Sequence, residues 1–176
     1  PHSYSSAASD VYKRQHNWVT AWVALTDSNE NNGCMKMWPK SHLNIKDHNE
    51  KFNEGNLLTR GQTVENVPED EVKSIELKAG QMSLHHPRVV HGSGFNKSND
   101  RRIGFVIQSY IGTNVKQTLG KNSVQIARGE DKYNFHKKIG RPNGLMNKND
   151  LKIKKQENDY LQEIFYKGSV KKGKFL

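Results

Sequence analysis

The chain of 176 residues contains a single cysteine, Cys34, and no long hydrophobic run. One cysteine excludes an internal disulfide, so a reducing, cytoplasmic setting is the default expectation. A membrane-spanning helix needs about 20 consecutive apolar residues, and no segment approaches that length. A signal peptide with a charged start and an apolar stretch is not visible either. We therefore expect a cytoplasmic protein without a membrane partner.

Acidic residues are scarce relative to basic ones, with 18 Asp and Glu against 28 Lys and Arg. Residues 132–176 hold 12 of the basic and 4 of the acidic residues, so eight of the ten net positive charges lie there. A nucleic-acid surface would need this charge on one face, with aromatics placed for stacking. The alternative is a solvated, lysine-rich surface. Lysine dominates and the aromatics fit packing, so we expect no nucleic-acid partner.

Residues 1–15 lack a periodic apolar pattern. Their last six, DVYKRQ, resemble the translation of a transposon adapter used in sequencing libraries. We interpret residues 1–15 as a non-native leader, and a natural flexible N-terminus is the alternative. The hydrophobic fraction is 33% and the mean hydropathy is -0.92, which still permits one modest core. Residues 16–176 are therefore expected to form one domain, with a basic helical tail from about residue 132.

Between Trp18 and Tyr110 the sequence is typical of β-structure. Apolar runs or alternating residues, bounded by Asn, Gly and Pro turn signals, predict strands at 20–27, 34–38, 74–77, 81–84 and 102–110. Several short strands separated by loops favour a sandwich or a barrel. The long loop over 42–71 is expected to shape a substrate entrance. Apolar residues at 160, 161, 164 and 165 predict a helix on the outside of the barrel, ended by Gly168.

Three polar residues near position 100 carry the candidate chemistry. His91 can bind a metal, since non-haem Fe(II) sites use two histidines and one carboxylate. Arg102 opens the next predicted strand, and a guanidinium matches a carboxylate in a bidentate manner. Ser93 lies two residues after His91, shares its face in an extended segment, and can add a hydroxyl. Each residue taken alone is also compatible with an ordinary core or surface side chain.

Three stretches resemble the phytanoyl-CoA dioxygenase family of Fe(II)/2-oxoglutarate oxygenases: VTAWVALTDSNENNGCMKMWPKSHL, LKAGQMSLHHPRVVHGSGFNKSNDRRIGF and RGEDKYNFH. The resemblance implies a mostly β fold, a double-stranded β-helix or jelly-roll barrel. It implies Fe(II) and 2-oxoglutarate as cofactors, with ascorbate as a candidate reductant. It also implies His91 as the distal iron ligand and Arg102 as the clamp for the 2-oxoglutarate carboxylate. Ser93 would assist Arg102, and Trp22 would line the cosubstrate pocket.

The family's other two iron ligands form a His-x-Asp motif about sixteen residues before the tryptophan that matches Trp22. Counting back reaches Tyr4 and Ser6, and residues 1–27 contain no His-x-Asp or His-x-Glu. We therefore expect the C-terminal part of an oxygenase. The complete enzyme would hydroxylate a C–H bond of a small molecule or an acyl-CoA while converting 2-oxoglutarate to succinate.

Two alternatives remain open at this point. A halogenase of the same family would carry a small residue in place of the carboxylate ligand, and that position is absent from this sequence. A non-catalytic binding domain on a jelly-roll scaffold would need no metal at His91. The residues specify neither the individual substrate nor the oligomeric state.

The missing motif leads to a first prediction. One imidazole does not hold Fe(II) at useful affinity, because the site needs its chelating partners. Titration of this chain with Fe(II) should therefore show no tight stoichiometric binding, and the chain should be catalytically inactive. An N-terminus that carries the motif should restore both tight iron binding and catalytic activity. Tight one-to-one binding of iron by the present chain would contradict the expectation.

Overall fold

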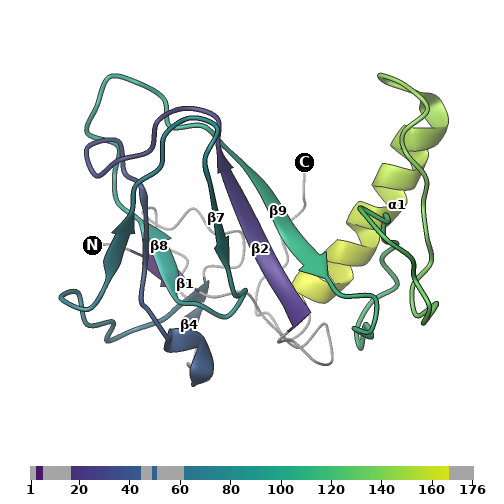
Figure 1. The fold of residues 1–176 in the computed structure, drawn as a ribbon, viewed down its shortest axis with the longest axis horizontal. Helices are drawn as coiled ribbons and strands as arrows, with labels where there is room; N and C mark the ends of the chain where they lie inside the picture. The colour runs from purple at the N-terminus through teal and green to yellow at the C-terminus, as the bar shows by residue number, and fades with distance from the viewer. Residues whose placement is uncertain (1–2, 6–16, 45–48, 51–61, 167–176) are drawn as a thin grey trace. The chain divides into compact units, whose positions relative to one another are not determined.

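A computed structural model describes residues 3–5, 17–44, 49–50 and 62–166. These residues are mostly β, with two larger antiparallel sheets and one α-helix near the C-terminus (Figure 1). They form two compact units. The first holds the described residues up to Ile111 except Asn17, and the second holds Asn17 and those from Gly112 onward. The non-native leader over 1–15 and the single domain over 16–176 stay predictions.

The first sheet of the first unit has four strands in the order β1-β8-β3-β6. Their bounds are β1 Ser3–Ser5, β8 His91–Ser93, β3 Met35–Met37 and β6 Lys73–Ile75. All the pairings are antiparallel, and Ser5 of β1 is the Cα partner of His91. Strand β1 thus belongs to the segment that was expected to be a leader, and it lies next to the strand that carries the candidate metal ligand.

The second sheet has three strands, with β2 (Trp18–Ala24) between β7 (Met82–His85) and β9 (Gly104–Ile111). Two short strands, β4 (Asn49–Glu50) and β5 (Gln62–Thr63), form a separate pair. All five predicted strands overlap observed ones, with bounds shifted by a few residues. The mostly β class is therefore confirmed, whereas closure into a double-stranded β-helix stays a prediction.

A small apolar core lies where the two sheets of the first unit meet. Met35, Met37 and Val89 are buried and form one cluster, against which Trp22 of β2 and Ile75 of β6 pack. Since Met35 and Met37 come from β3 and Trp22 comes from β2, this cluster joins the two sheets. The alternation of strand side chains therefore gives each sheet one face toward this cluster and one face away from it.

The second unit contains helix α1, Lys148–Phe165. Asn147 caps its N-terminus by accepting hydrogen bonds from the backbone N–H groups of Asn149 and Asp150. The carboxylate of Glu157 accepts hydrogen bonds from the backbone N–H and the hydroxyl of Ser123, which ties a loop to the helix. The helix begins well before the apolar residues that predicted it. Within the described residues, no helix has the length and apolar character to span a bilayer.

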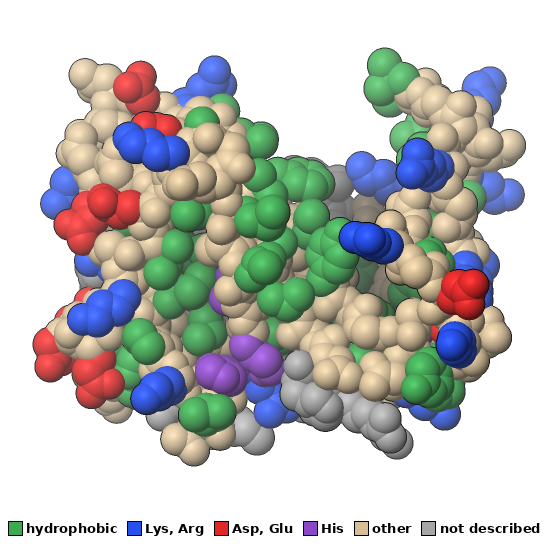
Figure 2. Space-filling model, in the orientation of Figure 1, with side chains coloured by type: hydrophobic (Ala, Val, Ile, Leu, Met, Phe, Trp, Pro, Cys, Tyr) green, Lys and Arg blue, Asp and Glu red, His purple; other side chains and the backbone are tan. Residues whose placement is uncertain are grey.

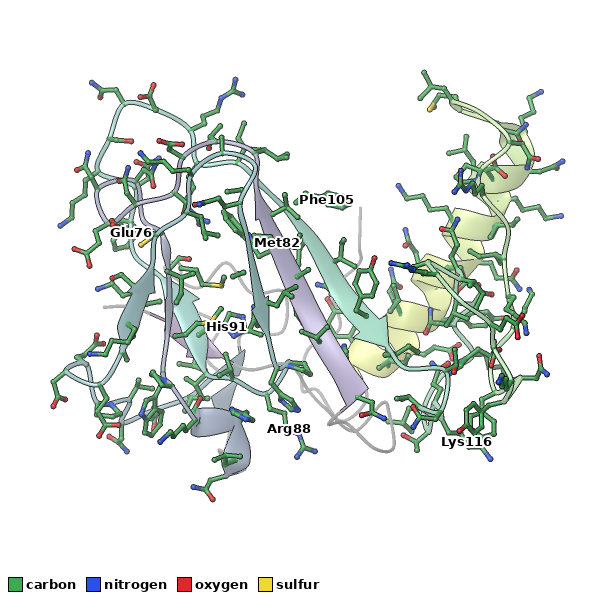
Figure 3. All side chains as sticks on the ribbon, in the orientation of Figure 1. Glu76, Met82, Arg88, His91, Phe105 and Lys116 are labelled. Atoms are coloured by element: carbon green, nitrogen blue, oxygen red, sulfur yellow. The ribbon has the colours of Figure 1, made fainter. Side chains whose placement is uncertain are left out.

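The face of β7-β2-β9 that points away from the core is apolar and exposed. Met82 and Phe105 flank Val23 in register, and Leu84 is paired with Ala21. Met82, Leu84 and Phe105 are 57%, 64% and 58% exposed. Figure 2 shows hydrophobic side chains gathered over these strands, and Figure 3 labels Met82 and Phe105 among them. Exposed patches of this kind mark contact surfaces or promote aggregation.

We predict that this face drives self-association of the chain. Replacing Met82 and Leu84 together by lysine should shift the chain toward the monomer in size-exclusion chromatography with light scattering. Both side chains are exposed, so the free energy of unfolding should change by less than about 1 kcal/mol. Leu145→Lys is the control, because Leu145 is 99% exposed but belongs to the second unit. Equal effects of the control and the double variant would contradict the prediction.

Candidate functional site

The backbone just before His91 is held at both of its polar groups. The N–H of Val90 donates to the Oγ of Ser41 at 2.8 Å, and the carbonyl of Val90 accepts from the N–H of Trp38 at 2.9 Å. Ser41 opens the short 3-10 helix Ser41–Leu43, so the segment 39–42 supports the start of β8. Val90 itself is fully buried. These contacts fix the position from which the imidazole of His91 projects.

His91 projects toward the core side of its sheet. It is the Cα partner of Met37 in an antiparallel pair, and such partners point to the same face. Met37 is buried in the cluster between the sheets. Figure 3 shows His91 at β8, on the side of β7. Ser93 shares this face by alternation and is paired with Met35, but its side chain is exposed.

The state of the His91 imidazole suits a metal ligand. Its Nδ1 lies 2.8 Å from the carbonyl oxygen of Val89, so Nδ1–H donates and the lone pair remains on Nε2. Burial lowers the pKa of His91, while the hydrogen bond to Val89 acts in the opposite direction. A neutral imidazole whose other nitrogen is anchored to a backbone carbonyl is the usual arrangement for histidine ligands.

Trp22 and Arg102 are in direct contact. The guanidinium carbon of Arg102 lies 5.5 Å from the centroid of the indole ring, within the range of a cation–π interaction. Among the described residues, no carboxylate forms an ion pair with this half-buried guanidinium. The N–H groups at its edge are therefore not committed to an internal acid. Trp22 also packs on the core cluster that His91 faces, so the contact with Arg102 lies beside that cluster.

The absence of a side chain at Gly104 permits this contact. A Cβ at Gly104 would lie 2.1 Å from Cζ2 and 2.3 Å from Cε2 of the Trp22 indole. Such distances are far below van der Waals contact, so the ring occupies the space that a side chain would need. Gly104 opens β9 two residues after Arg102, and the indole therefore lies across the start of this strand.

The sequence reasoning did not select His85, although the structure places it beside His91. The two ring centroids are 5.5 Å apart. Burial, and next the charge of His91, lower the pKa of His85 to about 4. The Nδ1 of His85 and the Oγ of Ser83 are buried without a hydrogen-bond partner in the described structure. The alternation in the segment Met82–His85 was the available signal, because it directs both polar residues to the core face.

The structure thus brings Trp22 together with Arg102, and His91 together with His85. The roles of His91, Ser93, Trp22 and Arg102 stay predictions, because they concern a bound metal and cosubstrate. Among the residues that the structure describes, no group of three His, Cys, Asp or Glu side chains could hold a metal ion. A complete iron site is therefore not formed by this part of the chain.

Comparison with protein families identifies one match. The profile described as Phytanoyl-CoA dioxygenase (PhyH) matches residues 2–104, a range that includes all four predicted site residues. It also includes most of the segment that was expected to be a leader. Human peroxisomal phytanoyl-CoA dioxygenase is 29% identical over 86 residues, which are 48% of this chain and 25% of that enzyme.

A probable alpha-ketoglutarate-dependent hypophosphite dioxygenase of Stutzerimonas stutzeri is 30% identical over 106 residues, 58% of this chain and 37% of that protein. The chain thus matches about a quarter to two fifths of the length of these curated relatives. Among solved structures, the apo form of the non-heme monooxygenase ThoJ is 27% identical with a TM-score of 0.77, covering 92% of this chain and 58% of ThoJ. CytC3 with Fe(II) and alpha-ketoglutarate has a TM-score of 0.53 at 20% identity, covering 78% of this chain and 55% of CytC3, and supports the fold alone.

Gly104→Ala tests the packing of Trp22. The added Cβ has no room unless the indole moves, and such overpacking lowers the free energy of unfolding by about 1–3 kcal/mol. Chemical denaturation measures this change, and near-UV circular dichroism should report the displaced ring. Gly140→Ala is the control, because a Cβ there meets nothing within 4 Å. Equal stability of the two variants would contradict the description of this contact.

Proposed function

Because the chain belongs to the phytanoyl-CoA dioxygenase family, we propose that it is the C-terminal part of an Fe(II)/2-oxoglutarate-dependent dioxygenase. The proposed reaction hydroxylates a C–H bond of a small molecule or an acyl-CoA. The observation that carries the proposal is the stacking of Arg102 on Trp22, beside the core cluster that His91 faces. The same core cluster thus lies beside Arg102, which would bind the diacid, and His91, which would bind the metal.

The guanidinium of Arg102 fits the far carboxylate of 2-oxoglutarate. The guanidinium carbon of Arg102 lies over the indole of Trp22, so the ring would help to orient the N–H donors of the cation. A carboxylate can accept two parallel hydrogen bonds from such an edge. Ser93, on the same strand as His91, would add a hydroxyl donor to that carboxylate.

The residues fit iron only in part. His91 would supply one nitrogen ligand through Nε2, since its Nδ1 is engaged by Val89. The expected positions of the other two ligands are Tyr4, in the strand β1 beside β8, and Ser6, outside the described residues. Bound iron and 2-oxoglutarate would supply the oxidising chemistry, and this chain would orient them. Arg102 would bind the diacid, and Trp22 would exclude water from one face of the guanidinium.

A second candidate is a jelly-roll domain that binds a carboxylate ligand without oxidising it. One observation favours it: within the described residues, no cluster of three metal-binding side chains is formed. Both candidates use Arg102 for the carboxylate, and they differ in the need for a metal. The family match and the likeness to ThoJ support the oxygenase as the first choice.

Arg102→Ala should weaken binding of 2-oxoglutarate. A hydrogen bond to a charged group contributes about 1.5–3 kcal/mol, so the dissociation constant should rise roughly 10- to 100-fold. Arg102→Lys should restore only part of the affinity, because an ammonium lacks the fork. Ligand-observed NMR with 2-oxoglutarate measures the binding. Arg101→Ala is the matched control, being the adjacent, exposed arginine. If Arg101→Ala causes the same loss as Arg102→Ala, the proposed clamp is wrong.

A further inference from the structure

Strand β7 carries its polar residues inward and its apolar residues outward. Met82 and Leu84 are exposed, whereas the Oγ of Ser83 and the Nδ1 of His85 are buried without hydrogen-bond partners in the described structure. Ser83 is paired with Trp22, so this inner face is the one directed at the core between the sheets. Unpaired buried polar atoms are costly, so their retention on an inward face indicates a ligand that satisfies them.

We propose that His85 and His91 together form a two-imidazole site for a divalent transition metal. His85 comes from β7 of the three-stranded sheet, and His91 comes from β8 of the four-stranded sheet. The proposal rests on the proposed function in one respect, namely that His91 is a metal ligand. It extends that function by adding a ligand from a different strand.

The spacing of the two rings is slightly wider than that of two imidazoles on a shared ion. A metal about 2.1 Å from one nitrogen of each imidazole, at a bond angle between octahedral and tetrahedral values, places the ring centroids roughly 4.5–5.2 Å apart. The centroids of His85 and His91 are 5.5 Å apart, with the ring planes inclined at 52°. A movement of a few tenths of an ångström would bring the rings into this range.

Both imidazoles have the lone pairs that a metal requires. The hydrogen bond from Nδ1 of His91 to Val89 leaves its lone pair on Nε2. The Nδ1 of His85 has no hydrogen-bond partner in the described structure.

In a second pair of histidines only one ring meets the same requirement. The ring centroids of His42 and His86 are 5.0 Å apart, and the Nδ1 of His42 is also buried without a hydrogen-bond partner in the described structure. The Nδ1 of His86, however, accepts a hydrogen bond from the backbone N–H of Arg88 at 3.1 Å. Its one lone pair in the neutral ring is therefore already engaged. His86 follows His85 directly in the sequence, so it serves as a matched control.

The ligand type indicates which metals the pair would bind. Imidazole nitrogen suits Ni²⁺, Cu²⁺, Zn²⁺ and iron, and affinity rises from iron toward copper. Two imidazoles without a carboxylate should bind less tightly than a complete facial site. Nickel binding by the pair is thus compatible with the expected lack of tight iron binding. Nickel is the probe of choice. The non-heme monooxygenase ThoJ has been solved as a nickel complex.

Nickel titration by calorimetry tests the site in the full chain without an affinity tag. The unmodified chain should bind Ni²⁺, and His85→Leu and His91→Leu should each weaken that binding at least roughly tenfold. His86→Leu should leave it unchanged. His85→Leu removes an unpaired buried nitrogen, so it should preserve the fold, which far-UV circular dichroism checks. Loss of nickel binding without loss of structure distinguishes a ligand from a packing residue.

The outcomes separate this inference from the proposed function. If His91→Leu weakens nickel binding and His85→Leu does not, the shared site is wrong and His91 remains a metal ligand. If neither variant changes binding, both the shared site and the role of His91 are wrong. Should His85→Leu fail to fold, NMR of the unmodified chain decides. Paramagnetic Ni²⁺ should broaden the ring signals of His85 and His91 first, and earlier broadening of His86 would overturn the proposal.

Discussion

The packing of the Trp22 indole is the contact on which the rest of the candidate site depends. One side of the ring contributes to the apolar cluster between the two sheets, and the guanidinium of Arg102 stacks on it. The ring occupies the space above Gly104 that any other residue would fill. The indole thus holds the guanidinium of Arg102 beside the core cluster that His91 faces.

A second constraint is the polar inner face of β7. Strands of two packed sheets usually direct apolar residues inward, yet this strand turns the half-buried Ser83 and His85 inward and exposes Met82 and Leu84. Each unpaired buried polar atom lowers the free energy of unfolding by about 1–3 kcal/mol. Departures of this kind from local rules concentrate at functional sites. The inner face therefore has the character of a site, and the outer face has the character of a contact surface.

The second unit is held together mainly by helix capping and by hydrogen bonds between a loop and helix α1. Helix α1 is stabilised by its Asn147 cap and by the hydrogen bonds from Ser123 to Glu157, while Ile164 fills the space beside Gly120. Its lysines lie mostly on exposed positions, and Lys155 forms an (i, i+4) pair with Asp159. The sequence predicted only the later part of this helix. Residues 148–159 are rich in lysine and asparagine, so the apolar periodicity that reveals an amphipathic helix begins after them.

Local sequence patterns were sufficient to predict the longer strands and the types of candidate residue. Alternation and turn residues are local properties, so they predicted β2, β3, β6, β7 and β9, whereas the short strands β4, β5 and β8 were not predicted. The segments resembling a known family indicated His91 and Arg102. Which of these residues meet depends on how the strands pair and how the sheets pack. Trp22 contacts Arg102 and Gly104 across some eighty positions of chain, and His85 faces His91 from another sheet. Pairing register and sheet packing create these contacts, and neither is a property of any local stretch of sequence.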